Sequence, residues 1–331
     1  MDKRLKQIEF WLPEVIGETI LSLEVASADA SFRRYFRATT KDGSYVVMDA
    51  PPDKEPLAPF IAIDRALLDL GVHAPAIHAE DLEQGFLLLE DLGNTTYLQK
   101  LPGSSQSLYS AAIDTLIKIQ CGSDISPDHV LPAYDAARLR QEMGLFDDWY
   151  LKRHVDVQLN EAQQLIWNDT QQILIDACLE QPQVWVHRDY HSRNLMVTDQ
   201  DSPAVIDFQD MCVGPISYDL ASLFKDCYIE WPRDTQHEWL EAYYLRALNT
   251  VPNVNFSLSD LLRWFDLTGL QRHLKVLGIF CRLNYRDGKS HYLGDLPLVK
   301  KYTLEVLDYY PDLNNFRRML TSLLESSGQG Q

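Results

Sequence analysis

The feature that most constrains the fold is an island of short apolar strands and polar loops, residues 184–210, in a half of the chain that otherwise has helical periodicity. The first strand leads into the tripeptide His187-Arg188-Asp189. Asn194 precedes the second strand, and Asp207 ends the third. Polar side chains on loops that a rigid scaffold holds are the usual carriers of catalysis and binding. We therefore expect the functional site on this island.

Asp189, Asn194 and Asp207 carry the side chains that phosphoryl transfer requires. The reaction needs a carboxylate beside the acceptor hydroxyl. It also needs an amide and a second carboxylate as oxygen ligands for Mg²⁺, which neutralises charge on the nucleotide phosphates. Asn194 comes five residues after Asp189, and Asp207 comes thirteen residues after Asn194. A strand, loop, strand and turn that present Asp, Asn and Asp in this order can supply all three groups.

Hydrophobic periodicity divides the chain into two lobes. Residues 1–92 are strand-rich, with a first helix that we expect Pro13 to end, a hairpin turned by Asp42-Gly43, and a helix over residues 58–70 closed by Gly71. Residues 93–325 are mostly helical, and we expect a disordered tail over residues 326–331. The sequence thus predicts an α+β fold with a small β-rich N-terminal lobe, a hinge at its end, and a larger helical C-terminal lobe.

The charge balance limits the partners. The chain has 331 residues, with 30 basic and 48 acidic side chains, which gives a net charge of −18. Nucleic acids and anionic membranes attract basic surfaces, so we expect neither as a partner. The five cysteines are scattered, with no CxxC pair, which favours a reduced, cytoplasmic protein without disulfides.

The island resembles a known signature. His-Arg-Asp followed by Asn194 and by a strand-terminal Asp207 is similar to the protein-kinase pattern, and the form in this chain looks more like the aminoglycoside phosphotransferase family of small-molecule kinases. Within that family, the segments SADASFRRYFR, GFLLLEDLG and LFDDWY resemble bacterial kinases that phosphorylate amino sugars during peptidoglycan recycling. The resemblance implies a two-lobed protein-kinase-like fold. It also implies ATP as co-substrate and phosphorylation of the anomeric (C1) hydroxyl of N-acetylmuramate or N-acetylglucosamine.

The resemblance also implies residue roles. Asp189 would be the catalytic base, and Asn194 and Asp207 would hold Mg²⁺. Backbone groups from Glu90 to Leu92 would bind adenine at the hinge. His187 and Asp219 would be structural supports, and Asp219 would brace the catalytic loop.

The N-terminal lobe departs from the kinase pattern at the phosphate-binding positions. The loop from Ser27 to Phe32 has no glycine, Met48 stands where a strand lysine is expected, and the helix over residues 58–70 has no glutamate. A glutamate without its lysine would be an unpaired buried charge, so the two losses are consistent with each other. We expect Arg33 and Arg34 to bind the phosphates instead, although both could lie on an exposed strand face.

The acceptor site is less defined by the sequence. N-acetylmuramate carries a lactyl carboxylate, so we expect a cation near it. Arg272 and Lys275 have the spacing to share one side of a long helix with Arg282. We add His273 and Glu142 as candidate substrate residues. The alternative is a solvated basic stripe.

Three other functions remain open at this stage. The acceptor could be an aminoglycoside or another small alcohol. The departures at Met48 and in the loop would also suit a pseudokinase. His187, Asp189 and His191 alternate in a way that, with Asp207, could suit a zinc hydrolase. We expect a monomer that acts on a small molecule.

Overall fold

The computed structural model describes residues 2–28, 32–122, 131–251 and 255–328. The chain forms two compact units, residues 1–104 with 193–210, and residues 105–192 with 211–331. The first unit is therefore larger than the lobe predicted over residues 1–92. It gains the second half of the island because Thr96 bridges to Met196 and His73 bridges to Ala204. These pairings are tertiary, and the linear pattern of the sequence does not carry them.

The first unit contains a five-stranded antiparallel sheet with the order β1-β2-β3-β5-β4. The predicted hairpin is confirmed as β2 and β3, and the loop proposed between the first two strands includes residues 29–31, which lie outside the described residues. The strand bounds are β1 (Ser22–Ala28), β2 (Arg34–Thr39), β3 (Ser44–Asp49), β4 (Ile77–Asp81) and β5 (Phe86–Glu90).

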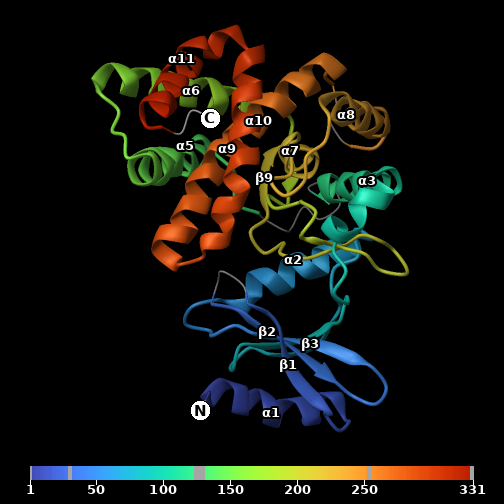
Figure 1. Cartoon of the computed structure of the whole chain (residues 1–331). Helices are drawn as coiled ribbons and strands as arrows, with labels where there is room; N and C mark the ends of the chain where they lie inside the picture. The colour runs from blue at the N-terminus through green and yellow to red at the C-terminus, as the bar shows by residue number, and fades with distance from the viewer. Residues whose placement is uncertain (1, 29–31, 123–130, 252–254, 329–331) are drawn as a thin grey trace. The chain divides into compact units, whose positions relative to one another are not determined.

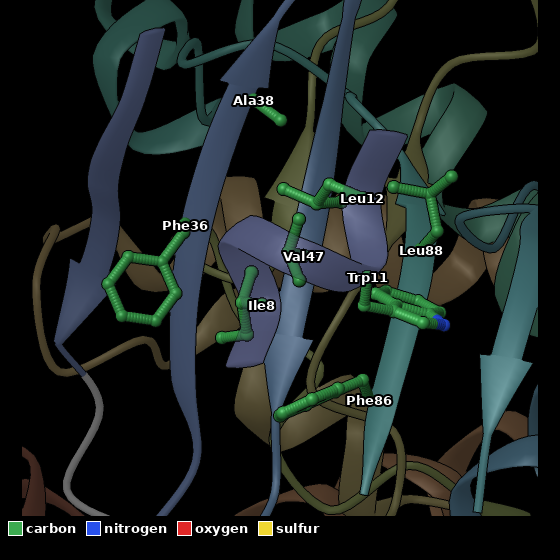
Figure 2. Packing of buried hydrophobic residues seen from close by; sticks show 8 residues of the cluster. All are labelled: Ile8, Trp11, Leu12, Phe36, Ala38, Val47, Phe86 and Leu88. Carbon is green, nitrogen blue, oxygen red and sulfur yellow. The ribbon is translucent and has the colours of Figure 1, made fainter. Parts of the chain in front are cut away.

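Helix α1 (Lys3–Ile16) packs on one face of this sheet. Its side chains meet alternate residues of the strands, as Figure 2 shows for a cluster of eight buried residues: Ile8, Trp11, Leu12, Phe36, Ala38, Val47, Phe86 and Leu88. The prediction that Pro13 ends this helix is wrong, since the helix continues to Ile16 and stops at Gly17 in the left-handed region (φ 72°). A proline costs one backbone hydrogen bond, and the buried apolar face offsets that loss.

The other face of the sheet carries the residues that alternate with this cluster, because successive side chains of a strand point to opposite faces. Val46 and Met48 of β3 pair with Leu89 and Leu87 of β5 on that face. Helix α2 (Leu57–Asp69) follows β3, and Gly71 with φ 69° comes two residues after its end, as the sequence predicts. Two short strands complete the unit, β7 (Leu195–Met196) and β8 (Ala204–Val205).

The second unit is mostly helical (Figure 1). Helix α3 runs from the first unit into the second, with a non-helical Ser104 at the passage. Residues 135–154 have continuous helical periodicity in the sequence, and in the structure they form an α-helix followed by the π-helix η1. The bounds are α3 (Tyr97–Gln120), α5 (Ala136–Leu145), η1 (Phe146–Val155), α6 (Glu161–Leu179), α7 (Tyr218–Phe224), α8 (Arg233–Ala247), α9 (Leu258–Asp287), α10 (Leu296–Tyr309) and α11 (Asn314–Ser326), with 3₁₀ turns η2 (Ser290–Asp295) and η3 (Pro311–Leu313).

The chain's end differs in part from the predicted disordered tail over residues 326–331. Helix α11 reaches Ser326, and residues 329–331 lie outside the described part.

Helix α9 is the centre of the second unit. A capping box between Ser257 and Asp260 begins it, and Gly288 with φ 70° ends it. It contacts α5, α6, α7, α8, α10 and η1, so most of its circumference is buried. Gly278 lies so close to the backbone of Leu145 that a Cβ at that position would be 2.3 Å from the Leu145 carbonyl. The buried polar residues of this helix, Arg272 and Lys275 among them, are therefore held within the unit's interior.

Within the described ranges, no helix combines the length and the apolar character needed to cross a bilayer.

Candidate active site

The loop that carries Asp189 is held at its beginning by Asp219. Strand β6 (Gln183–Val186) pairs with β9 (Cys212–Pro215) and delivers the loop. The buried Asp219 carboxylate accepts hydrogen bonds from the backbone N–H of His187 (2.7 Å) and of Arg188 (3.0 Å). Arg188 has φ 76°, in the left-handed region that non-glycine residues rarely adopt. The predicted bracing role of Asp219 is thus confirmed, and its two hydrogen bonds hold the strained turn.

A second carboxylate, Asp226, holds the end of the same loop. Its Oδ2 accepts from the backbone N–H of Ser192 (3.0 Å) and from the Ser192 hydroxyl, and its Oδ1 accepts from the backbone N–H of Tyr228 (3.0 Å). Asp226 is fully buried. The sequence prediction did not include this anchor. Its only signal is an acidic residue seven positions after Asp219, just beyond α7.

Asp189 lies between these two anchors and reaches solvent, with 41% of its side chain exposed. Burial would raise the pKa of its carboxyl, but the cations Lys275, His191 and Arg272 lower that pKa to about 2. The Nη2 of Arg272 lies 3.9 Å from Asp189 Oδ1. Asp189 is therefore an ionised carboxylate over the whole physiological pH range.

Two of the candidate substrate residues, Glu142 and Lys275, form an ion pair with each other. Glu142 accepts from Lys275 Nζ (3.0 Å), Arg188 Nη2 (2.5 Å) and the Tyr134 hydroxyl. Lys275 also lies 3.3 Å from the Tyr218 hydroxyl. Burial would raise the pKa of Glu142, but the two cations keep it below its usual value. This cluster is a closed ion-pair network, so the structure places Glu142 and Lys275 together but commits both to internal partners.

The structure does not place His273 with Glu142 and Lys275. Its ring stacks on Tyr302 and its Nε2 lies 3.1 Å from the Lys225 carbonyl oxygen. Burial lowers the pKa of His273 to about 3, so the ring is neutral. Neighbouring helix positions point about 100° apart, which is why Arg272 faces Asp189 while His273 packs elsewhere.

The first unit contains a cavity of about 380 Å³, a size typical of small-molecule sites. Its polar wall is the chain from Glu90 to Asn94, which includes the predicted hinge residues Glu90 and Leu92, together with Arg193, Asn194 and Asp207. Apolar side chains from β3, β5, β7 and the segment after β8 also line the cavity and suit a flat aromatic ring: Val46, Leu89, Met196, Ile206 and Phe208.

Asn194 and Asp207 meet at this cavity. The Asn194 Nδ2 donates to Asp207 Oδ2 (3.2 Å), and Gln209 Nε2 donates to Asp207 Oδ1 (2.7 Å). Asp207 has φ 64° at the end of its strand. An amide oxygen beside a carboxylate fits Mg²⁺, which takes one or two carboxylates and completes its shell with phosphates and waters.

The zinc alternative gains no support from the residues. Among the described side chains, no group of three or more His, Cys, Asp or Glu is arranged to hold a metal ion.

The predicted phosphate-binding arginines are engaged elsewhere. Arg33 pairs with Glu55 (2.9 Å), and Arg34 pairs with Asp49 and Asp2. Neither lines the cavity. The basic residues in its lining are instead Arg37, which is bound to Asp91 at the hinge (2.7 Å), and Arg193. Strand alternation places Arg34 on the α1 face of the sheet and Arg37 on the opposite face.

The positions that lack kinase residues are buried. Met48 is fully buried, as is Asp64 of α2. Neither carboxylate oxygen of Asp64 has a hydrogen-bond partner. Burial, opposed by the charge of Arg65 and reinforced by that of Glu90, raises the pKa of Asp64 to about 7. Asp64 is thus a buried acid without the basic partner that a kinase helix glutamate has.

Comparisons with known proteins agree with this architecture. The model of the phosphotransferase enzyme family matches residues 22–254. A Pseudomonas putida N-acetylmuramate/N-acetylglucosamine kinase is 44% identical, with 97% of both chains covered, and one from Neisseria meningitidis is 40% identical, with 98% of this chain and 97% of the relative covered.

The solved structures agree on the fold. An ADP-bound aminoglycoside phosphotransferase has a TM-score of 0.60 at 15% identity, covering 92% of this chain and 99% of its own. A choline kinase from Streptococcus pneumoniae has a TM-score of 0.61 at 15% identity, covering 91% of this chain and 99% of its own. The predicted two-lobed kinase-like fold is therefore confirmed, and the chain belongs to the phosphotransferase enzyme family.

Proposed function

We propose that this protein is an ATP-dependent kinase that phosphorylates the anomeric hydroxyl of N-acetylmuramate and N-acetylglucosamine. The observation that carries the proposal is the identity of 44% over 97% of the chain with a kinase named for these two sugars. The local geometry supports the same reaction class. A solvent-reaching carboxylate, Asp189, is held between two buried anchors, and a cavity suited to a nucleotide is lined by Asn194 and Asp207.

In the first unit, adenine would bind among the apolar residues of the cavity, with the hinge backbone from Glu90 to Leu92 supplying hydrogen bonds. Asn194 and Asp207 would hold Mg²⁺, which supplies charge neutralisation for the phosphates when bound. Gln209 donates to Asp207 and so fixes the orientation of that carboxylate. The stretch from Asp189 to Asn194 passes from the second unit to the first, so the proposed base and one of the two proposed metal ligands are five positions apart in the chain.

In the second unit, Asp189 would accept the hydrogen bond of the sugar C1 hydroxyl. A carboxylate with a pKa near 2 is a weak base, so it orients the hydroxyl and takes the proton only as the new oxygen–phosphorus bond forms. The bond between the γ-phosphorus and the bridging oxygen breaks, ADP leaves, and Asp189 returns the proton to water. Such late proton transfer suits the loose transition state of phosphoryl transfer.

The expected surroundings of the enzyme follow from its charge. We propose a cytoplasmic monomer that acts on small molecules and binds neither nucleic acid nor membranes, in keeping with a net charge of −18.

The test is a substrate panel with MgATP that includes both N-acetylated sugars, an aminoglycoside and choline, with the phosphate position of each product assigned by ³¹P and ¹H NMR. We expect phosphate on C1 of the amino sugars and no turnover with Asp189→Ala, which sits on a loop and should leave the fold intact. Preferred phosphorylation of the aminoglycoside or choline would refute the assignment. Absence of turnover on every acceptor would favour a pseudokinase.

A further inference from the structure

Arg272 differs from the other cations behind the catalytic loop. Arg188 and Lys275 both form ion pairs with Glu142, whereas Arg272 faces Asp189 and hydrogen-bonds Cys227. The Nε and Nη1 of Arg272 have no hydrogen-bond partner. Only 3% of the Arg272 side chain is exposed. A buried donor without a partner costs about 1–3 kcal/mol, so folded proteins rarely keep one without a use.

The distance between Arg272 and Asp189 defines a place for one oxygen atom. Arg272 Nη2 and Asp189 Oδ1 lie 3.9 Å apart, which is too long for a direct hydrogen bond. A single oxygen can therefore lie at hydrogen-bond distance, about 2.7–2.9 Å, from both of these atoms at once. Such an oxygen would donate its proton to the carboxylate and accept a hydrogen bond from the guanidinium.

We propose that Arg272 is a second catalytic residue, and that the acceptor hydroxyl oxygen binds between its guanidinium and the carboxylate of Asp189. This proposal rests on the proposed function and deepens it. As the oxygen–phosphorus bond forms, the hydroxyl proton moves to Asp189 while the hydrogen bond from Arg272 holds the oxygen in place, and ADP leaves with the electrons of the broken bond. Arg272 keeps its own protons throughout.

The other group that Arg272 could bind is the lactyl carboxylate, which N-acetylmuramate carries and N-acetylglucosamine lacks. The position of Arg272 beside the proposed base favours the reacting oxygen, which both sugars share. The pair of sugars therefore separates the two roles, because a carboxylate-binding residue matters for one sugar and a residue at the reacting oxygen matters equally for both.

The experiment measures kcat and KM with saturating MgATP for Arg272→Gln and Arg272→Lys on both sugars. We expect Arg272→Gln to lower kcat by the same factor on each, about 10²-fold, as for a reacting oxygen that is no longer held in position, with little change in KM. Arg272→Lys keeps the charge but loses the guanidinium fork, so it should recover part of the rate. Arg286→Gln is the matched control, because Arg286 is an exposed residue in the last turn of the same helix.

A rise in KM confined to N-acetylmuramate would overturn the proposal in favour of carboxylate binding, and an unchanged kcat on both sugars would also overturn it. Thermal unfolding of each variant separates misfolding from loss of chemistry, and Arg272→Lys serves as the test if Arg272→Gln does not fold. If the wild-type enzyme phosphorylates a different acceptor, the proposed function fails. The Arg272 comparison is then made on that acceptor, where an equal kcat for wild type and variant overturns the present proposal separately.

Discussion

Replacing Asp64 by Asn tests the claim that the first unit contains a buried carboxyl without a partner. Asp64 is 0% exposed, and neither of its oxygens is hydrogen-bonded. Burial, reinforced by Glu90, raises its pKa from 3.8 to about 7. Asn has nearly the same shape but carries no charge at any pH, so the substitution removes the titration and little else.

The sign of the effect follows from which state binds the proton. Between pH 4 and pH 7 the folded state keeps the Asp64 proton while the unfolded chain releases it. Rising pH therefore lowers the stability of the wild type, and the loss is complete near pH 8. With about 1.4 kcal/mol for each unit of pKa difference, the wild type should lose about 2–3 kcal/mol between pH 5 and pH 8 that Asp64→Asn does not lose.

The assay is urea unfolding at pH 5 and pH 8, followed by tryptophan fluorescence, for both proteins. The difference between variant and wild type isolates Asp64 because all other titrating groups are shared. Asp69→Asn removes an exposed carboxylate from the same helix and should change stability by less than about 0.5 kcal/mol at either pH. If the stability difference between Asp64→Asn and wild type is the same at both pH values, Asp64 is not a desolvated acid and the reasoning fails.

Three further predictions test the anchors, the packing and the phosphate site. Asp226→Asn should lower kcat by about 10–100-fold by loosening Ser192, with the KM for ATP unchanged in steady-state kinetics; a normal kcat would show that one anchor suffices. Gly278→Ala should destabilise by about 1–3 kcal/mol in urea because its Cβ meets the Leu145 carbonyl, whereas Gly144→Ala, which has open space around it, should not. Arg193→Met should raise the KM for ATP about tenfold, and a larger effect of Arg33→Met would restore the arginine pair named from the sequence.

The parts of the fold that the sequence predicts are those with local causes. Asp42-Gly43 supplies its own turn and Gly71 ends a helix, so these elements lie where the pattern places them. The passage from α5 to the π-helix at Phe146 has no such local signal. Strand β9 also escapes prediction, since it exists through its pairing with β6.

The candidate catalytic residues can be proposed from the sequence because their spacing reflects the chemistry, whereas their supports depend on side chains distant in sequence. Asp226 holds Ser192 from 34 positions away, and Glu142 reaches Arg188 across 46. A linear pattern does not reveal which of several acidic residues makes such a contact. Arg272 and Lys275 of α9 illustrate the same limit. Their helical spacing can be read from the sequence, but the sequence does not show that Arg272 faces Asp189 while Lys275 pairs with Glu142.

The handling of phosphate charge is where sequence reasoning and structure diverge most. Arg33 and Arg34 follow the loop that would cover the phosphates, so proximity in sequence favours them, yet their charges are neutralised by Glu55 and Asp49. Arg193 lines the cavity next to Asn194, its neighbour in the chain. An enzyme without a strand lysine then needs its phosphate cation from the catalytic loop itself, so one short segment would supply the base, a phosphate-binding arginine and a metal ligand.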